Sequence, residues 1–227
     1  MSDILERLRG GLIVSVQAND DSLLNEPQAI ALLARVAVAN GAAGVRIEGV
    51  ERIRAVRAVV TLPIIGIIKQ RYDGFEPYIT STIEELHAVV DAGADIVAFD
   101  ATDRPRFGGA PTSALVQAVH AHERLAMADC ATLSDGRLAC AARADIVATT
   151  LAGYTLATQG RHLPALDLVE ALAAEHGFAV CEGGVAHPSQ VRDALRAGAA
   201  AVVVGTAITN IDTLVRRFAG AADRLEP

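Results

Sequence analysis

The 227-residue chain contains no tryptophan, and aromatic residues make up only 4% of it. Hydrophobic residues nevertheless account for 52%, so the core has to be built from alanine, valine, leucine and isoleucine. Such side chains suit short helices packed closely on a buried parallel sheet. The chain is long enough to bury a substantial core without disulfides or metals.

Cysteines and long apolar runs are scarce as well. Cys130, Cys140 and Cys181 are odd in number and lack C-x-x-C spacing, which disfavours a disulfide framework or a zinc site. The six histidines share no ligand spacing with carboxylates, so we expect no metal. No apolar run approaches the roughly 18 residues that span a bilayer, and the N-terminus, MSDILERLRGG, lacks a signal-peptide apolar region. We therefore expect a cytoplasmic protein.

Basic residues are also in deficit. Lysine and arginine number 20 against 27 aspartates and glutamates, which gives a net charge of -7. An acidic chain without a basic tract argues against nucleic acid and anionic membranes as partners. A small anionic substrate remains compatible with this charge, because its site needs only a few local donors.

Four stretches of the chain resemble one another: GAAGVRIE, GADIVAFD, RADIVATT and GAAAVVVG. Their starts, at Gly41, Gly93, Arg143 and Gly198, are 52, 50 and 55 residues apart. A regular internal period indicates repeated supersecondary units. This period is the length of two β-α units.

Four further apolar runs lie between these repeats: LIVSVQ, IIGIIK, RLAMAD and FAVCEG. Helical patterns follow the strands at Pro27–Asn40, Val50–Val60, Thr82–Asp91, Thr112–His122, Ser134–Ala142, Pro164–His176, Pro188–Ala197 and Asn210–Ala222. Eight strands alternating with eight helices predict a parallel sheet that closes as a (β/α)₈ TIM barrel. We expect a single domain over residues 1–227.

Polar residues stand where these apolar strands end. The odd-numbered strands end in Gln17, Lys69, Asp129 and Glu182, and the even-numbered ones in Glu48, Asp100, Thr150 and Gly205. In a TIM barrel the active site lies at the carboxyl ends of the strands, where alternate strands contribute each layer of inward side chains. The pattern therefore predicts an active site at this mouth.

Lys69 and Glu182 stand out because they end opposite strands, the third and the seventh. Facing each other across the mouth, they would tune one another's protonation and form an acid/base couple. Arg46 shares a strand face with Glu48, and either binds substrate or forms a structural salt bridge in the mouth. Asp100 is either a site residue or a carboxylate that caps its loop.

Glycines follow the seventh and eighth strands, in EGGVAHPSQ and VVVGTAIT. TIM barrels often bind phosphate at these two loops, and glycine lets backbone N–H groups approach a ligand closely. We expect a phosphate cradle made by Gly183, Gly184, Gly205 and Thr206. Cys181 should point into the helix layer as a small apolar filler. The long segment QRYDGFEPYITST is a candidate lid.

Six stretches together carry a family resemblance: GIIKQRY, PYITSTIEEL, GADIVAFDAT, DIVATTLAGYT, CEGG and VVVGTAIT. They resemble the N-acylglucosamine-6-phosphate 2-epimerase (N-acetylmannosamine-6-phosphate 2-epimerase) family, in order and over nearly the whole chain. The resemblance implies a cofactor-independent isomerase that inverts C2 of N-acetylmannosamine 6-phosphate during sialic acid degradation. It also implies a homodimer.

The resemblance extends to individual site residues. Lys69 and Glu182 resemble the family's catalytic pair, and the residues that resemble its substrate contacts are Gln17, Arg46 and Asp129. The chain departs from the family at Asn210, where an arginine is common, and at Gly184, where a basic residue is frequent. Both departures remove positive charge near the expected phosphate.

Two other functions remain compatible with these residues. A phosphosugar lyase would use Lys69 to form a Schiff base with its substrate. A non-catalytic sugar-phosphate-binding barrel would need no acid/base pair, yet both members are present here.

Overall fold

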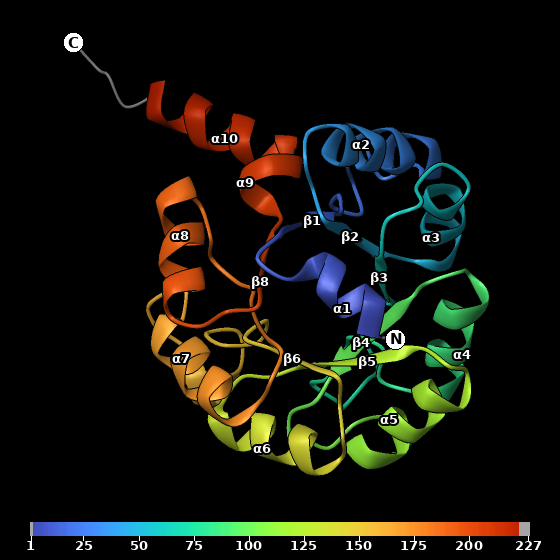
Figure 1. The fold of residues 1–227 in the computed structure, drawn as a ribbon. Coiled ribbons are helices and arrows are strands. Elements are labelled where there is room, and N and C mark those ends of the chain that lie inside the picture. The colour runs from blue at the N-terminus through green and yellow to red at the C-terminus, as the bar shows by residue number, and fades with distance from the viewer. Residues whose placement is uncertain (1, 223–227) are drawn as a thin grey trace.

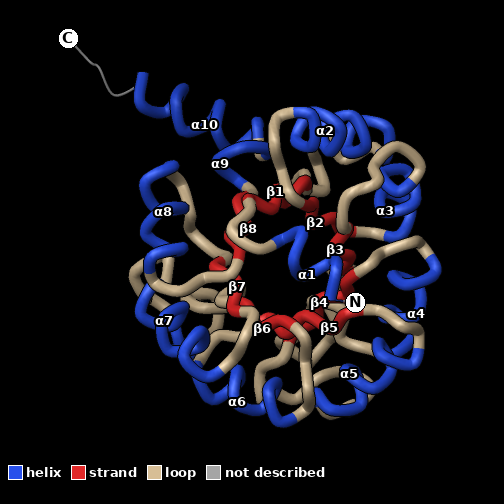
Figure 2. The backbone as a smooth tube through the Cα atoms, in the orientation of Figure 1, coloured by secondary structure: helices blue, strands red, loops and turns tan. Residues whose placement is uncertain are grey.

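Eight parallel strands close into a barrel in chain order, with helices around the outside (Figures 1 and 2). The structure, a computed structural model, describes residues 2–222. The strands are β1 (Leu12–Val16), β2 (Gly44–Glu48), β3 (Ile64–Ile67), β4 (Ile96–Asp100), β5 (Leu125–Asp129), β6 (Ile146–Ala148), β7 (Ala179–Cys181) and β8 (Ala201–Val204). The predicted TIM barrel is confirmed. Met1 and residues 223–227, which the predicted domain also includes, lie outside the described residues.

All eight predicted helices occur, with ends within three residues of those expected. They are α2 (Pro27–Ala39), α3 (Val50–Arg57), α4 (Ile83–Asp91), α5 (Thr112–Ala121), α6 (Leu133–Ala141), α7 (Leu166–Glu175), α8 (Pro188–Arg196) and α10 (Ile211–Ala222). The sequence did not predict α1 (Ser2–Leu8), α9 (Thr206–Thr209) or the 3-10 turn η1 (Leu156–Thr158).

Strand β3 shows how alternation along a strand builds two layers of core. Ile65 and Ile67, each 1% exposed, pack in the barrel interior, whereas the residues between them face the helices. One of these is Gly66, where a Cβ would lie 2.5 Å from Val89 of α4 and 2.7 Å from Ala94. The glycine therefore allows α4 to pack directly against the strand.

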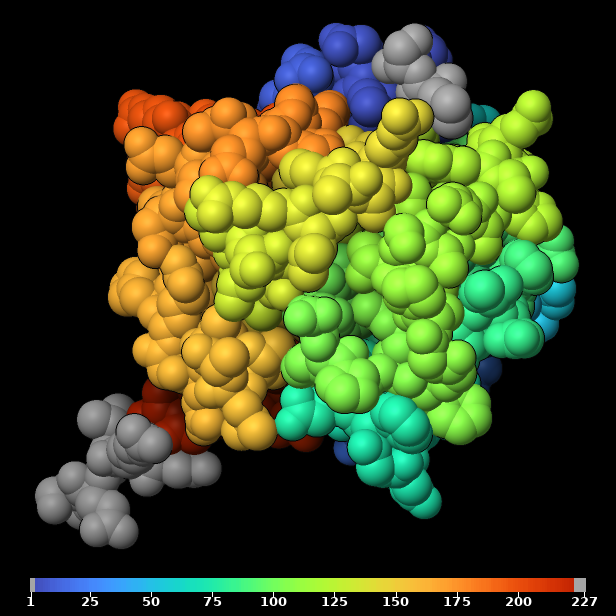
Figure 3. Space-filling model, turned by 90° about the horizontal axis from the view of Figure 1, so that it is seen from below, coloured from blue at the N-terminus to red at the C-terminus, as the bar shows by residue number. Residues whose placement is uncertain are grey.

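Helix α1 closes the end of the barrel opposite the strands' carboxyl termini. Leu8 is fully buried in the interior cluster that includes Ile13 and Ala200, and the Gly10 N–H donates to the Ala200 carbonyl at 2.7 Å. In Figure 3 the N-terminal residues lie at one end of the molecule, and the teal segment near residue 75 lies at the other. The carboxyl ends of the strands are thus left open.

Helix α10 leaves the barrel instead of packing on it (Figure 1). None of its residues is buried, and Ile211, Val215 and Phe218 are 46%, 59% and 78% exposed. Their spacing of four and three residues places them on one helix face. No helix among the described residues is long and apolar enough to cross a membrane.

Candidate active site

A cavity of about 370 Å³ opens at the carboxyl ends of the strands. The predicted site residues that line it are Gln17, Arg46, Lys69, Glu182, Gly183, Gly184, Gly205 and Thr206. Asp129 lies fully buried beneath it, bonded to Arg46. Glu48 and Asp100 do not line the cavity. The structure thus brings together residues from strands far apart in the sequence.

Arg46 sits between two carboxylates in the barrel mouth. Its guanidinium donates to both Asp129 carboxylate oxygens, at 3.1 and 2.6 Å, and to Glu182 Oε2 at 2.7 Å. Arg46 is 1% exposed and Asp129 is fully buried, so these charges depend on one another for compensation. Of the two roles considered for Arg46, the structural salt bridge is present, formed with Asp129 and Glu182, whereas Glu48 pairs with Arg52 of α3. Arg46 therefore orients Glu182 toward the cavity.

Glu182 has an unusual environment for a carboxylate. Burial raises its pKa to about 7, and the neighbouring Asp129 charge adds to the rise, while Arg46 opposes it. The Thr149 hydroxyl fixes the local backbone by accepting from the Glu182 N–H at 3.0 Å and donating to the Glu182 carbonyl at 2.8 Å. Glu182 is consequently a well-positioned group that exchanges its proton near neutral pH.

Lys69 is held by a short chain of polar contacts. Its Nζ donates to Gln17 Oε1 at 2.6 Å, and Gln17 Nε2 donates to the Ser15 hydroxyl at 2.7 Å. Desolvation in the mouth lowers the Lys69 pKa, and the Arg46 charge lowers it further. Within residues 2–222 the ion pairs do not join Lys69 to Glu182. The two groups line one cavity without neutralising each other.

The two glycine loops lie at the same cavity. Gly183 and Gly184 have φ angles of 107° and 72°, in the region that strongly favours glycine, and a Cβ at Gly184 would lie 2.3 Å from the Leu163 Cβ. In the part of the chain that the structure describes, their N–H groups donate to no protein acceptor. Gly205 precedes α9 and approaches Ser15, to which an added Cβ would lie at 3.2 Å. These loops therefore present backbone donors with little side-chain cover.

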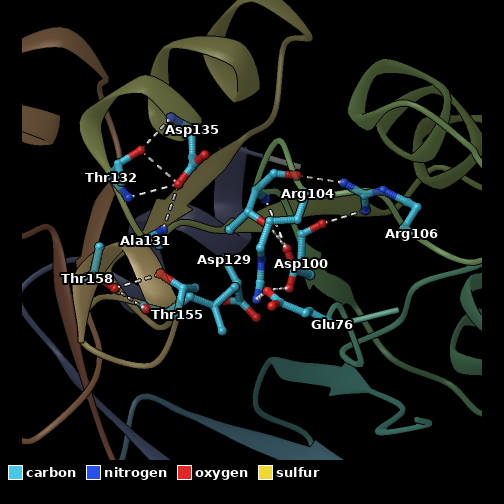
Figure 4. A network of polar contacts seen from close by, with 12 residues as sticks. Glu76, Asp100, Arg104, Arg106, Asp129, Ala131, Thr132, Asp135, Thr155 and Thr158 are labelled. Atoms are coloured by element: carbon cyan, nitrogen blue, oxygen red, sulfur yellow. Dashed lines mark hydrogen bonds and ion pairs between the residues drawn. The ribbon is translucent and has the colours of Figure 1, made fainter. Parts of the chain in front are cut away.

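Asp100 belongs to a network of polar contacts with Arg104 and Glu76 (Figure 4) and does not line the cavity. Its Oδ1 accepts from the Thr102 N–H at 3.0 Å and the Thr102 hydroxyl at 2.6 Å, and Oδ2 accepts from Arg104 at 2.7 Å. Arg104 also pairs with Glu76 at 2.9 Å. Of the two interpretations of Asp100, the geometry supports the loop-capping one.

The candidate lid segment is attached to its surroundings. Tyr72 stacks on Phe107 with ring centroids 4.1 Å apart, and the Gln70 N–H donates to the Tyr78 carbonyl at 2.9 Å. The Tyr72–Phe107 stacking and the Glu76–Arg104 pair hold the segment against the β4–α5 loop, and the Gln70–Tyr78 hydrogen bond closes the segment on itself. The segment also places Tyr78 in the cavity lining.

Several residues at the mouth were not identified from the sequence. Among them, Ser15 and Tyr78 line the cavity, and Thr149 holds the backbone of Glu182. Ser15 precedes Gln17 by two residues and so shares its strand face, a signal that could have found it. Thr149 stands beside Thr150, the predicted strand end, which donates to Asp129 Oδ1 at 2.6 Å. Tyr78 carries no comparable signal, because the path of its segment places it.

Cys181 points away from the mouth, as expected. It is fully buried in a cluster with Val202 and Ala194, and burial raises the pKa of its thiol to about 11. A thiol with that pKa is a weak nucleophile at neutral pH. Among residues 2–222, no three His, Cys, Asp or Glu side chains are grouped as metal ligands.

Comparison with known proteins identifies the family of the chain. Residues 30–224 match the family model described as "Putative N-acetylmannosamine-6-phosphate epimerase". Two relatives, from Escherichia coli O9:H4 and Shigella flexneri, are 44% identical to this chain over 209 residues. Each is named "Putative N-acetylmannosamine-6-phosphate 2-epimerase". The match covers 92% of this chain and 90% of each relative.

The solved structures agree. The N-acetylmannosamine-6-phosphate 2-epimerase from Clostridium perfringens superposes with a TM-score of 0.92 and 38% identity, covering 96% of both chains. Thiamine phosphate pyrophosphorylase from Pyrococcus furiosus, at 14% identity and a TM-score of 0.60, shares the fold alone. The extent and level of identity show that the chain belongs to the N-acetylmannosamine-6-phosphate epimerase family.

Proposed function

We propose that this protein interconverts N-acetylmannosamine 6-phosphate and N-acetylglucosamine 6-phosphate by inverting C2, as a step of amino-sugar and sialic acid catabolism. Its relatives are named for this activity. One observation carries the proposal: Lys69 and Glu182 line one cavity without forming a direct ion pair. The pKa of Lys69 is lowered and the pKa of Glu182 is raised, so both shift toward neutral pH. Such a pair is equipped to move protons near neutral pH.

The chemistry requires two proton transfers at one carbon. The C2 hydrogen is acidic only beside the C1 carbonyl, so the ring-opened sugar is the reacting form. One group removes that proton and leaves an enolate, and the other group returns a proton to the opposite face of C2. In the reverse direction Lys69 and Glu182 exchange roles, and no cofactor is consumed.

The enolate's negative charge needs a cation or hydrogen-bond donor nearby. Lys69 in its protonated form supplies one, and Gln17 fixes its position through the 2.6 Å contact. Arg46, held by Asp129, keeps the Glu182 carboxylate directed at the cavity. The phosphate group binds the N–H groups of the Gly183 and Gly205 loops.

Proton NMR of the protein with N-acetylmannosamine 6-phosphate in D2O tests the proposal. We expect the epimer to form with deuterium at C2. Lys69→Met and Glu182→Gln should each slow this exchange at least about a hundredfold, with unchanged circular dichroism. Absence of exchange in the parent enzyme refutes the proposed function, and normal turnover by either variant removes that residue from catalysis.

The same sample separates the two alternatives, which the comparisons do not favour. Borohydride treatment with substrate should leave Lys69 unmodified, whereas a covalent adduct there would indicate a Schiff-base lyase. Binding of the phosphosugar without any C2 exchange would indicate a non-catalytic barrel.

We also propose a homodimer that covers the apolar face of α10. A stripe of three exposed apolar residues on one helix is unusual for a free surface, and a two-fold axis would let the stripe pack against its own copy. Phe218, 78% exposed, is its largest member. Sedimentation should show a dimer for the parent protein and a monomer for Phe218→Glu; a monomeric parent refutes the dimer.

A cytoplasmic location belongs to the same proposal. The three cysteines form no disulfide, a state that reducing compartments maintain. Cell fractionation followed by immunoblotting checks it, and recovery in a secreted fraction would contradict it.

A further inference from the structure

We propose that Arg217, on α10, supplies the positive charge that binds the substrate's phosphate group. The inference rests on the proposed function and names a residue that determines its specificity. Three cationic side chains from the described residues line the cavity: Arg46, Lys69 and Arg217. Arg46 already compensates two carboxylates, and Lys69 is held by Gln17 at the reacting centre. Arg217 is the cation left for a phosphate.

The glycine loop after β7 cannot supply this charge itself. A side chain at Gly184 would begin 2.3 Å from the Leu163 Cβ and would need a φ of 72°. Residue 210, at the start of α10, is an uncharged asparagine. Backbone N–H groups at Gly183 and Gly205 offer partial charges only, so a full positive charge beside the phosphate has to come from another element.

The helix geometry directs Arg217 to the cavity. Seven residues, or about two helical turns, separate it from Asn210, so the two lie on one face of α10, and both line the cavity. Long helical side chains lean toward the N-terminal end of their helix. The Arg217 guanidinium therefore reaches back toward Asn210 and the Gly205 loop, on a different face from Val215.

The start of α10 is tied to the barrel, which fixes where Arg217 lies. Asn210 Nδ2 donates to Asn19 Oδ1 at 3.2 Å, and Asn210 Oδ1 accepts from the Thr213 N–H at 3.0 Å. One residue into the helix, Asp212 Oδ2 accepts from the Ser22 hydroxyl at 2.6 Å. The Asn210–Asn19 and Asp212–Ser22 hydrogen bonds join the start of α10 to the β1–α2 loop at the cavity edge.

Arg217 is also available to a ligand. The ion pairs formed among residues 2–222 do not include it, and its side chain is exposed. A guanidinium offers a planar fork of donors that matches two phosphate oxygens. An exposed arginine at this edge would cover the open side of the cavity with charge of the sign that binds phosphate.

Steady-state kinetics of Arg217→Gln, with Arg216→Gln as the matched control, tests the proposal. Arg216 is the adjacent arginine on the same exposed helix and does not line the cavity. We expect Arg217→Gln to raise KM for N-acetylmannosamine 6-phosphate about 10- to 100-fold, the range of one charge-assisted hydrogen bond, with little change in kcat. Arg216→Gln should behave as wild type, and kcat/KM for unphosphorylated N-acetylmannosamine should be equal in all three proteins.

A KM for Arg217→Gln within twofold of wild type overturns the inference, as does an equal loss with both sugars. Calorimetric titration with N-acetylglucosamine 6-phosphate keeps this test separate from the proposed function. If the parent enzyme fails to epimerise but Arg217→Gln binds this ligand at least tenfold more weakly than Arg216→Gln, the phosphate site stands and the reaction assignment falls. Equal binding by both variants removes Arg217 from the site.

Discussion

Replacing Glu182 with glutamine removes a catalytic group, yet it should favour the folded state more at pH 8 than at pH 5. The quantity compared is the difference in unfolding free energy between the variant and wild type. The Glu182 side chain is only 13% exposed, and burial raises its pKa from an ordinary 4.5 to about 7. The wild-type chain must therefore keep a poorly solvated carboxylate at alkaline pH. Glutamine fills a similar volume and carries no charge to desolvate.

The magnitude follows from proton linkage. Below pH 4.5 Glu182 is protonated in both the folded and the unfolded states, so it contributes no pH dependence. Between 4.5 and about 7 the unfolded chain has lost this proton and the folded chain retains it, so stability falls as pH rises. At about 1.4 kcal/mol per pH unit the whole effect is about 3 kcal/mol, of which about 2 kcal/mol lies between pH 5 and pH 8.

Urea denaturation of both proteins at pH 5 and pH 8, at one protein concentration, measures this quantity. The difference in unfolding free energy between Glu182→Gln and wild type should be about 2 kcal/mol more favourable to the variant at pH 8. Glu175→Gln is a control with almost no double difference, because pairing with Arg137 lowers the Glu175 pKa and both its folded and unfolded forms are ionised over most of this pH range. A double difference for Glu182→Gln as small as that of the control, or one of opposite sign, would refute the argument that Glu182 is a desolvated carboxylate.

Three further predictions concern catalysis, phosphate and packing. The kcat/KM of wild type should rise as pH passes about 7, where Glu182 ionises. It should fall again before pH 10.5, because the Lys69 pKa is lowered. A flat profile over this range contradicts the roles of both residues. Gly205→Val should raise KM for the phosphosugar with folding retained, and an unchanged KM means that no cradle operates there. Gly66→Ala should lower the unfolding free energy by about 1–3 kcal/mol, measured in urea, because its Cβ would contact Val89 at 2.5 Å.

The barrel could be predicted from the sequence because the apolar periods and the repeat specify it without tertiary information. Helix α1 could not, since its seven residues are too few to show a helical period, and packing of Ile4, Leu5 and Leu8 under the barrel stabilises it. The same limit applies to α10. Its amphipathic pattern is legible in the sequence, whereas its departure from the barrel depends on tertiary contacts that no local pattern encodes.

The candidate site divides in the same way. Strand-end position was enough to place Lys69 and Glu182 at one mouth, because strand alternation fixes the inward face. The sequence placed Arg46 and Glu48 on one strand face and left open whether Arg46 binds substrate or forms a structural salt bridge, but it indicated no partner for that bridge. Asp129 of β5 pairs with Arg46 of β2, and only closure of the barrel brings these two side chains together.

The contacts between the first and last strands have a consequence for synthesis of the chain. Strand β1 pairs with β8, and the Gly10 N–H bonds to Ala200, so the barrel cannot close until nearly all of the chain has left the ribosome. At about 5–20 residues per second, β1 waits on the order of 10–40 s with one edge unpaired. During that time the unpaired edge of β1 presents N–H and C=O groups that can pair with other chains, so the nascent protein is open to aggregation until translation ends.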